Sequence, residues 1–218
     1  MNASLKAALL HAFLIGWVLF FGFPLYLAII TATHDTQTLM QGALPYLPGR
    51  ALFDNLRQVF DHQVSALGGV SLWRILWNSF WMATGIALGK ITIALFSAFS
   101  LVYFSFPFKR VFMMMVIMTM MLPIEVRLVP TFEIIAMIHG LNSLWGLTCP
   151  LMVSATATLL FRQYFLKIPT HLVDAAKLDG VGPMRFFIDI LLPLSKSPMA
   201  SLFVVLFIYG WNQYLWPL

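Results

Sequence analysis

The sequence predicts an all-α membrane protein that crosses the bilayer several times. Of its 218 residues, 61% are hydrophobic and only 10% are charged, and the mean hydropathy is +0.88. Soluble domains carry about a quarter charged residues, so this chain cannot cover itself with polar surface. Lipid is therefore its main solvent, and the chain is best counted in membrane spans.

Five apolar runs are expected to form spanning helices, for which about 20 residues at a rise of about 1.5 Å each cross the hydrocarbon core. They are residues 7–32, 75–102, 111–124, 144–161 and 198–218. The third of them is cleanly apolar over a shorter stretch. The first run far exceeds the apolar region of a signal peptide, about 7–15 residues, and is expected to be a span.

The third run is expected to break or kink near its exit, because Pro123 and Pro130 bracket Glu125 and Arg127 there. Thr131–Ile138 is expected to form a short interfacial helix that Gly140 ends.

The distribution of Lys and Arg predicts the orientation. With the N-terminus inside, eight of the thirteen fall in the cytoplasm and four outside, and Lys90 lies within the second span. Because cytoplasmic loops are enriched in these residues, we expect residues 34–74 in the periplasm and residues 162–197 in the cytoplasm. The cations are scattered and form no basic patch, so nucleic acid is not an expected partner.

The long polar connection predicts two short helices joined by a turn. Thr170 suits an N-cap, Gly180 suits the left-handed position that ends the first helix, and Pro183 suits the first turn of the second helix, which Pro193 closes. Ala175 and Ala176 allow close approach by another protein. This pattern favours a docking element over a merely solvated loop.

These residues resemble the EAA loop of permease subunits in ABC importers, whose pattern is EAA, three residues, G, nine residues and I-x-L-P. The matching positions, with an aspartate where the family usually has glutamate, are Asp174, Ala175, Ala176, Gly180, Ile190, Leu192 and Pro193. In that family the loop inserts into a cleft of the cytoplasmic ATPase, so the resemblance implies an ATPase-coupling role for these seven residues.

Other stretches resemble the maltose-G-like permeases, and among them the permeases for sn-glycerol 3-phosphate. They are Asn78-Ser-Phe, Leu88-Gly-Lys-Ile-Thr, Met121-Leu-Pro-Ile-Glu-Val-Arg, Ser154-Ala-Thr-Ala-Thr and Tyr209-Gly-Trp-Asn-Gln-Tyr-Leu-Trp-Pro. The resemblance implies the type-I ABC importer permease fold, with five of an expected six spans visible here.

The same resemblance implies a multi-pass subunit of the bacterial inner membrane, with a cytoplasmic N-terminus, that translocates sn-glycerol 3-phosphate or glycerophosphodiesters. It implies no enzyme activity in this chain and no cofactor of its own, because ATP and Mg²⁺ would be bound by a separate dimeric ATPase. Expected partners are that ATPase, a second permease subunit, a periplasmic solute-binding protein and the lipid bilayer.

Five residues are candidates for the translocation pathway, each with a structural alternative. Lys90 sits near the middle of a span, where a charge is costly, on a face with Ala83, Ala87 and Ala94. It could meet a substrate phosphate, or bond to helix carbonyls or to an acidic group of a partner. For the others, the alternative to substrate contact is a local ion pair or interhelical hydrogen bonding: Glu125, Arg127, Asn212 and Gln213.

Several other patterns give little evidence of a function. Gly85-x-x-x-Gly89-Lys90 departs from a phosphate-binding loop in its spacing and favours helix packing. The methionines of 113–121 suit lipid contact or packing better than a pathway lining. The histidines show no metal-ligand spacing. Two other functions stay open: a permease for an uncharged sugar or oligosaccharide, and a non-transporting membrane sensor or docking protein.

Overall fold

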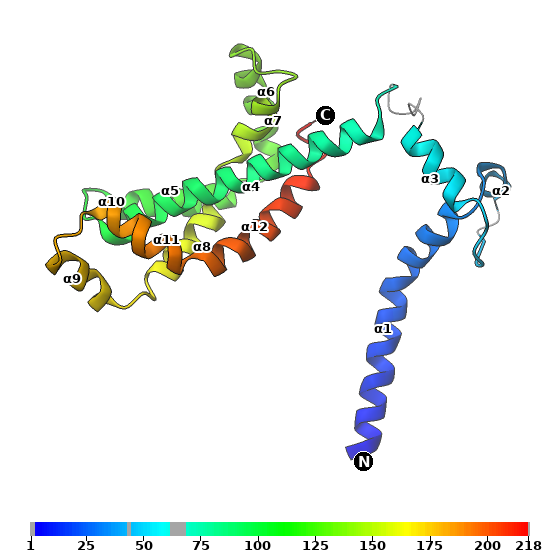
Figure 1. The fold of residues 1–218 in the computed structure, drawn as a ribbon, viewed down its shortest axis with the longest axis horizontal. Helices are drawn as coiled ribbons and strands as arrows, with labels where there is room; N and C mark the ends of the chain where they lie inside the picture. The colour runs from blue at the N-terminus through cyan, green and yellow to red at the C-terminus, as the bar shows by residue number, and fades with distance from the viewer. Residues whose placement is uncertain (1–2, 43–44, 62–68, 218) are drawn as a thin grey trace. The chain divides into compact units, whose positions relative to one another are not determined.

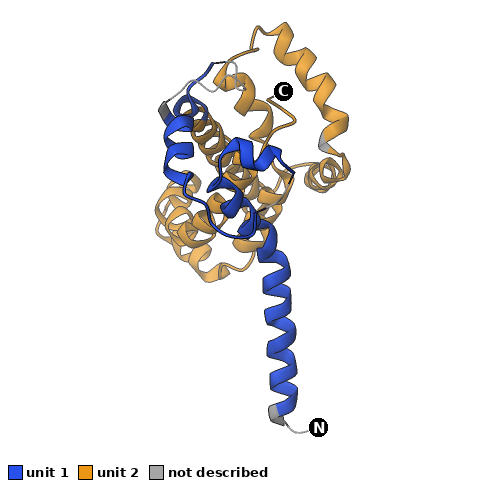
Figure 2. Cartoon of the chain, turned by 90° about the vertical axis from the view of Figure 1, so that its right-hand side faces the viewer, with its two compact units in different colours: residues 1–75 blue, residues 76–218 orange. Residues whose placement is uncertain are grey.

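The computed structural model describes residues 3–42, 45–61 and 69–217. These residues form helices joined by short turns, and no strand occurs among them (Figure 1). The predicted all-α class is thereby confirmed. The chain divides into two compact units, residues 1–75 and residues 76–218 (Figure 2).

The first unit is dominated by α1, Ala3–Ala32, which is followed by α2, Thr36–Met40, and α3, Leu52–Asp61. Within α1, Leu5–Ala32 is long and apolar enough to cross a membrane. Its side chains are apolar on every face and nearly all exposed within the unit. A helix of this kind is expected in contact with lipid or with other membrane helices.

The second unit is built along α4, Leu72–Tyr103, which has 32 residues and is also long and apolar enough to span a membrane. Small residues form a buried stripe along this helix at spacings of three and four. Lys90 lies on the stripe and is only 6% exposed, as the pattern of small residues predicts. The stripe consists of four alanines and one lysine: Ala83, Ala87, Lys90, Ala94 and Ala98.

The third apolar run forms two helices, α5 (Lys109–Met121) and α6 (Ile124–Met137). The break falls at Leu122 and Pro123, near the predicted exit. The expected short helix over Thr131–Ile138 is wrong, because α6 begins seven residues earlier and runs through Pro130. A proline inside a helix removes one backbone hydrogen bond, and α6 continues on both sides of the loss.

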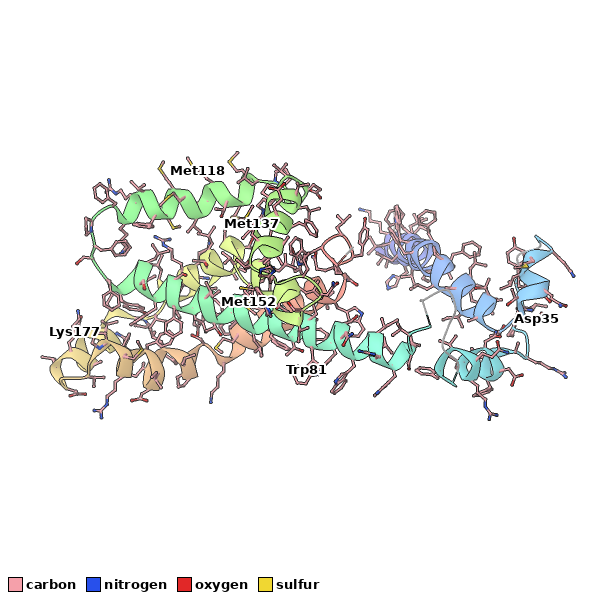
Figure 3. The ribbon with its side chains drawn as sticks, turned by 90° about the horizontal axis from the view of Figure 1, so that it is seen from above. Asp35, Trp81, Met118, Met137, Met152 and Lys177 are labelled. Atoms are coloured by element: carbon pink, nitrogen blue, oxygen red, sulfur yellow. The ribbon has the colours of Figure 1, made fainter. Side chains whose placement is uncertain are left out.

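The methionines of α5 lie mostly on the surface of the unit. Figure 3 shows Met118 on the outer side of α5, and its side chain is 60% exposed. Met114 and Met121 are exposed as well. This surface placement supports the interpretation of these residues as lipid-facing or packing side chains.

The fourth run is bent. It consists of α7, Leu144–Thr148, a 3₁₀ turn over Cys149–Leu151, and α8, Ala155–Phe165, with a bend of 52° between its two parts. Ser154 begins α8 by accepting a hydrogen bond from the amide of Ala157, at 3.3 Å. This side-chain cap satisfies one of the free amides at the helix start.

The fifth run forms α12, Lys196–Trp211. Between α8 and α12 lie α9, Thr170–Leu178, and a helical segment made of α10, Pro183–Arg185, the π-helix Phe186–Leu191, and α11, Leu192–Leu194. This last segment meets α12 at a bend of 72°. If each bent pair of helices counts as one span, the described residues hold up to five.

Glycines allow close helix packing around α4. A Cβ on Gly89 would lie 2.4 Å from Cγ of Met152, and a Cβ on Gly210 of α12 would lie 2.9 Å from Cα of Ala83. Both distances are far below ordinary contact, so neither position accepts a side chain without a shift. The helix-packing interpretation of the Gly85 and Gly89 pair is confirmed, since Gly85 in turn contacts Thr148.

Candidate functional site

The predicted coupling loop begins with a short helix that ends in a left-handed turn. The amide of Val181 donates to the carbonyl of Ala176 at 2.9 Å, and the amide of Gly180 donates to the carbonyl of Lys177 at 3.1 Å. These two bonds form a Schellman motif, which requires positive φ at its glycine. Gly180 has φ of +71°, as its place in the sequence predicts.

The beginning of this helix differs from the prediction. Pro169, in an extended conformation, occupies the N-cap position, and Thr170 is already helical. The assignment of Thr170 as N-cap is therefore wrong. The physical reason is that Pro169 disfavours a helical conformation for Ile168, so the helix starts directly after the proline.

The second half of the loop begins as predicted and ends differently. Pro183 occupies the first turn of α10, but Pro193 lies within α11, and the helical segment ends at Ser195. The stretch Phe186–Leu191 is π-helical, and the amide of Leu192 donates to the carbonyl of Phe187, five residues back. A proline has no amide to donate, and a π-turn before it is one way for a helix to absorb that loss.

The loop has an exposed face and a buried face. Asp174 and Ala175 are exposed, with the Asp174 carboxylate 4.0 Å from Nζ of Lys177. Lys177 lies at one end of the second unit in Figure 3. Ala176 is buried at 5% exposure, so of the two alanines only Ala175 is open to another protein. Among the remaining predicted coupling residues, Gly180 and Pro193 are exposed and two are half-buried: Ile190 and Leu192.

The buried face connects the loop to α4 through aromatic rings. Phe187 contacts Phe99 with ring centroids 4.9 Å apart, and Phe186 meets Tyr103 edge-on at 5.4 Å. Such ring pairs add about 0.5–1.5 kcal/mol beyond their area burial. Sequence reasoning missed Phe186 and Phe187, although they stand between the glycine and the I-x-L-P end of the motif. The loop is thus in direct contact with α4.

A cleft of about 450 Å³ lies beneath α9. Its apolar wall includes Tyr103, Phe165 and Phe186, and Asp174 and Lys177 stand at its polar edge. Below it, the Tyr164 hydroxyl donates to the carbonyl of Leu194 at 2.6 Å. The loop is therefore held to α4 and α8 from one side while its outer face stays open.

The second candidate site centres on Lys90. Its Nζ lies 3.7 Å from the centroid of the Tyr209 ring on α12. A cation this close to an aromatic face is attracted by the ring quadrupole. Within the described residues no acidic group pairs with Lys90, and its interaction with an acidic group of a partner subunit stays a prediction. Tyr209 begins the motif Tyr209–Pro217, and the sequence alone assigns this ring no role.

Arg127 belongs to the same neighbourhood. It is close enough to act electrostatically on both Lys90 and Tyr209. Gln213 is also near, and its side-chain amide donates to the carbonyl of Tyr209 at 3.4 Å. That bond is local, because Tyr209 lies four residues earlier in the same segment, and the interhelical alternative for Gln213 stays a prediction. Lys90 on α4 is buried, whereas Arg127 on α6 is exposed.

The other two predicted pathway residues are Glu125 and Asn212. In the described part of the chain, neither forms a hydrogen bond or an ion pair with Lys90 or Tyr209. Glu125 and Arg127 are both exposed, and among the described residues they form no ion pair with each other. The local ion pair weighed for them is therefore not present. Asn212 is exposed and ends α12, its amide donating to the carbonyl of Ile208 at 3.0 Å. In the part of the chain that the structure describes, no group of three His, Cys, Asp or Glu could hold a metal ion.

Comparison with known proteins places these features in context. The family model described as "Binding-protein-dependent transport system inner membrane component" matches residues 90–218. The sn-glycerol-3-phosphate transport system permease proteins UgpE of Escherichia coli K12 and of Salmonella typhi are each 50% identical over 208 residues, covering 95% of this chain and 74% of theirs.

A solved structure has the same fold. It is the crystal structure of a bacterial ABC transporter involved in the import of the acidic polysaccharide alginate, with a TM-score of 0.77 at 19% identity, over 99% of this chain and 75% of that one. The similarity is to the membrane-spanning fold and confirms the predicted type-I permease architecture.

Proposed function

Because the chain belongs to the family of inner membrane components of binding-protein-dependent transport systems, we propose that it translocates sn-glycerol 3-phosphate or glycerophosphodiesters. It is a transport component of the inner membrane and a permease of an ABC importer. Identity of 50% over 95% of the chain with permeases for sn-glycerol 3-phosphate supports this substrate over an uncharged sugar.

The observation that carries the substrate proposal is the buried Lys90 with Arg127 in its neighbourhood. A phosphate monoester carries about −1.5 to −2 charge near neutral pH, and cationic side chains are its usual protein partners. Burying Lys90 in an apolar span is costly, and the Tyr209 ring offsets part of that cost. A pathway for an uncharged sugar has no need of two cations at this point.

The ring of Tyr209 holds Lys90 when no anion is present. A passing phosphate competes for the ammonium, because a charge-assisted hydrogen bond is stronger than contact with a ring. The cation is then available transiently, which suits a pathway that must release its substrate. The half-buried Gln213 lies on the same side and suits the hydroxyl groups of glycerol.

The coupling loop is the second part of the proposal. We place residues 162–197 and the N-terminus in the cytoplasm and residues 34–74 in the periplasm, in accordance with the charge bias. The exposed Asp174 and Ala175 would then face a dimeric ATPase, which binds ATP and Mg²⁺. Closure of that dimer would push on the loop and, through Phe186 and Phe187, on α4. A second permease and a periplasmic binding protein complete the transporter.

The test is uptake of labelled sn-glycerol 3-phosphate by the reconstituted transporter carrying Lys90→Gln. A hydrogen bond to a charged group contributes about 1.5–3 kcal/mol, so we expect uptake to fall by about 10- to 150-fold. Basal ATP hydrolysis and subunit assembly should be unchanged, and Lys90→Arg should retain most uptake.

Two results would contradict the proposal. Wild-type uptake and apparent affinity in an assembled Lys90→Gln transporter would remove the substrate role of Lys90. Uptake of an uncharged sugar in place of sn-glycerol 3-phosphate by the unmodified transporter would show that the other permease class is correct.

A further inference from the structure

The helix α3 has two sharply different faces. At about 100° per residue, its apolar residues fall within an arc of about 120° and its polar residues occupy the remainder. The apolar face is made of Leu52, Phe53, Leu56, Val59 and Phe60, and the polar side includes Asp54, Asn55, Arg57 and Gln58. The segment is far less apolar overall than α1, which distinguishes it from a spanning helix.

The apolar face of α3 is open within its unit. Phe53 is 81% exposed, and Leu56 and Phe60 are 46% and 50% exposed. None of these side chains carries a hydrogen-bonding group. Left in water, the face would be an unprotected apolar patch, which soluble surfaces avoid.

Hydrogen bonds fix α3 to the end of α1. The Asn55 side-chain amide donates to the carbonyl of Ala32 at 2.9 Å and to the carbonyl of His34 at 2.8 Å. The amide of Ala51 donates to the carbonyl of Thr33 at 2.9 Å. These bonds satisfy carbonyls that the last turn of α1 leaves without helical partners.

This attachment determines the depth of α3. The apolar part of α1 has 28 residues and is therefore about 42 Å long, more than the hydrocarbon core of about 30 Å. At tilts up to about 40° its span along the bilayer normal still exceeds about 30 Å, so a centred helix places its end at Ala32 at the headgroup region. A helix bonded to Ala32 and His34 begins at the same level.

We propose that α3 lies in the plane of the membrane–water interface, with its apolar face in lipid. Asp54 and Gln58 then point to the aqueous side, and Phe53, Leu56 and Phe60 reach the boundary between headgroups and acyl chains. In this position α3 is an interfacial anchor that fixes the depth and direction of the chain where it leaves α1. The occupant is lipid and not a soluble partner, because a partner that leaves during the transport cycle would expose the whole face to water.

The inference can be tested by measuring the depth of individual side chains in the reconstituted transporter. Cys149, the single cysteine, is first replaced by serine. Single cysteines are then placed at Phe53, Leu56 or Phe60, with Asp54 and Gln58 as matched positions on the other side of the same helix. Each is labelled with a small fluorophore and exposed to a lipid-borne nitroxide quencher or to aqueous iodide.

For the three apolar-face positions we expect the ratio of lipid to aqueous quenching to exceed that of the two polar positions by about threefold or more. Stimulated ATP hydrolysis of each labelled transporter shows that it is assembled. Iodide access at Phe53 and Leu56 equal to that at Asp54 would overturn the inference. So would protection from both quenchers that disappears when the binding protein is omitted, because the face would then dock a protein.

Discussion

Replacing Gly180 by valine separates the conformation of the coupling turn from its contacts. A Cβ at this position meets no atom within 4 Å, so valine causes no clash. The whole cost is the positive φ of +71°, which a β-branched residue adopts at about 1–3 kcal/mol. If that cost falls on the docking-competent conformation of the loop, its population decreases by about 5- to 150-fold.

Gly182 supplies a matched control two residues away. A Cβ there would also meet no atom within 4 Å, but φ at Gly182 is −67° in an extended conformation that valine adopts readily. Gly182→Val therefore adds the same atoms to the same loop without the backbone cost. Gly180→Asn is a second control, because asparagine tolerates the left-handed region.

The assay is ATP hydrolysis stimulated by the binding protein, measured with the amount of ATPase that copurifies with the permease. We expect Gly180→Val to lose most of the stimulation or the bound ATPase, with Gly182→Val and Gly180→Asn close to the unmodified transporter. Equal stimulated hydrolysis in the Gly180→Val and Gly182→Val transporters would refute the argument that this turn must be left-handed for coupling.

Three further outcomes follow from the contacts. Tyr209→Leu removes a cation–π contact of about 0.5–2 kcal/mol that offsets the cost of burying the Lys90 charge, and this loss should lower uptake of sn-glycerol 3-phosphate by about 2- to 30-fold. In the cysteine-free background, a cysteine at Asp54 should react with an impermeant reagent in intact cells, and one at Asp179 only after permeabilisation. Gly210→Leu should lower the free energy of unfolding of the assembled transporter by about 1–3 kcal/mol, because its Cβ would lie 2.9 Å from Cα of Ala83.

Each of these has its own control. Tyr209→Phe keeps the ring and should preserve uptake, so an equal loss in both variants would point to the hydroxyl and not to the ring. Reaction of the Asp179 cysteine from outside would reverse the topology. Gly16→Leu on α1 enters open space, and a Gly210→Leu transporter as stable as this one would mean that α12 does not press on α4.

Local backbone chemistry was the most predictable part of the structure. Gly180 and Pro183 are constrained by their own φ angles, and the sequence predicts their positions in the coupling loop. The buried position of Lys90 was also predictable, because alanines three, four and seven residues away mark one helix face. In each of these cases the residues that determine the feature lie within one or two helical turns of it.

The features that were missed depend on contacts between distant segments. The Tyr209 ring reaches Lys90 from 119 positions along the chain, and no local pattern assigns it that role. Ala176 turns inward because Val181 and the rings below α9 cover it, which the alanine pair does not reveal. The proline rules failed at Pro130, since a helix with apolar neighbours on both sides tolerates the loss of a single hydrogen bond.

Because Phe186–Leu191 is π-helical, the directions of the side chains that follow it in the coupling loop differ from those of a regular α-helix. A π-turn holds one residue more than an α-turn, so every side chain after it is rotated by about 100° relative to an uninterrupted α-helix. Leu192 and Pro193 therefore face a different way from the one a helical wheel drawn from Pro183 gives. Deleting one residue within Phe186–Leu191 would restore regular winding and change the direction of Leu192 and Pro193 by the same angle. The winding of Phe186–Leu191 thus affects the direction of side chains that follow it in the coupling loop.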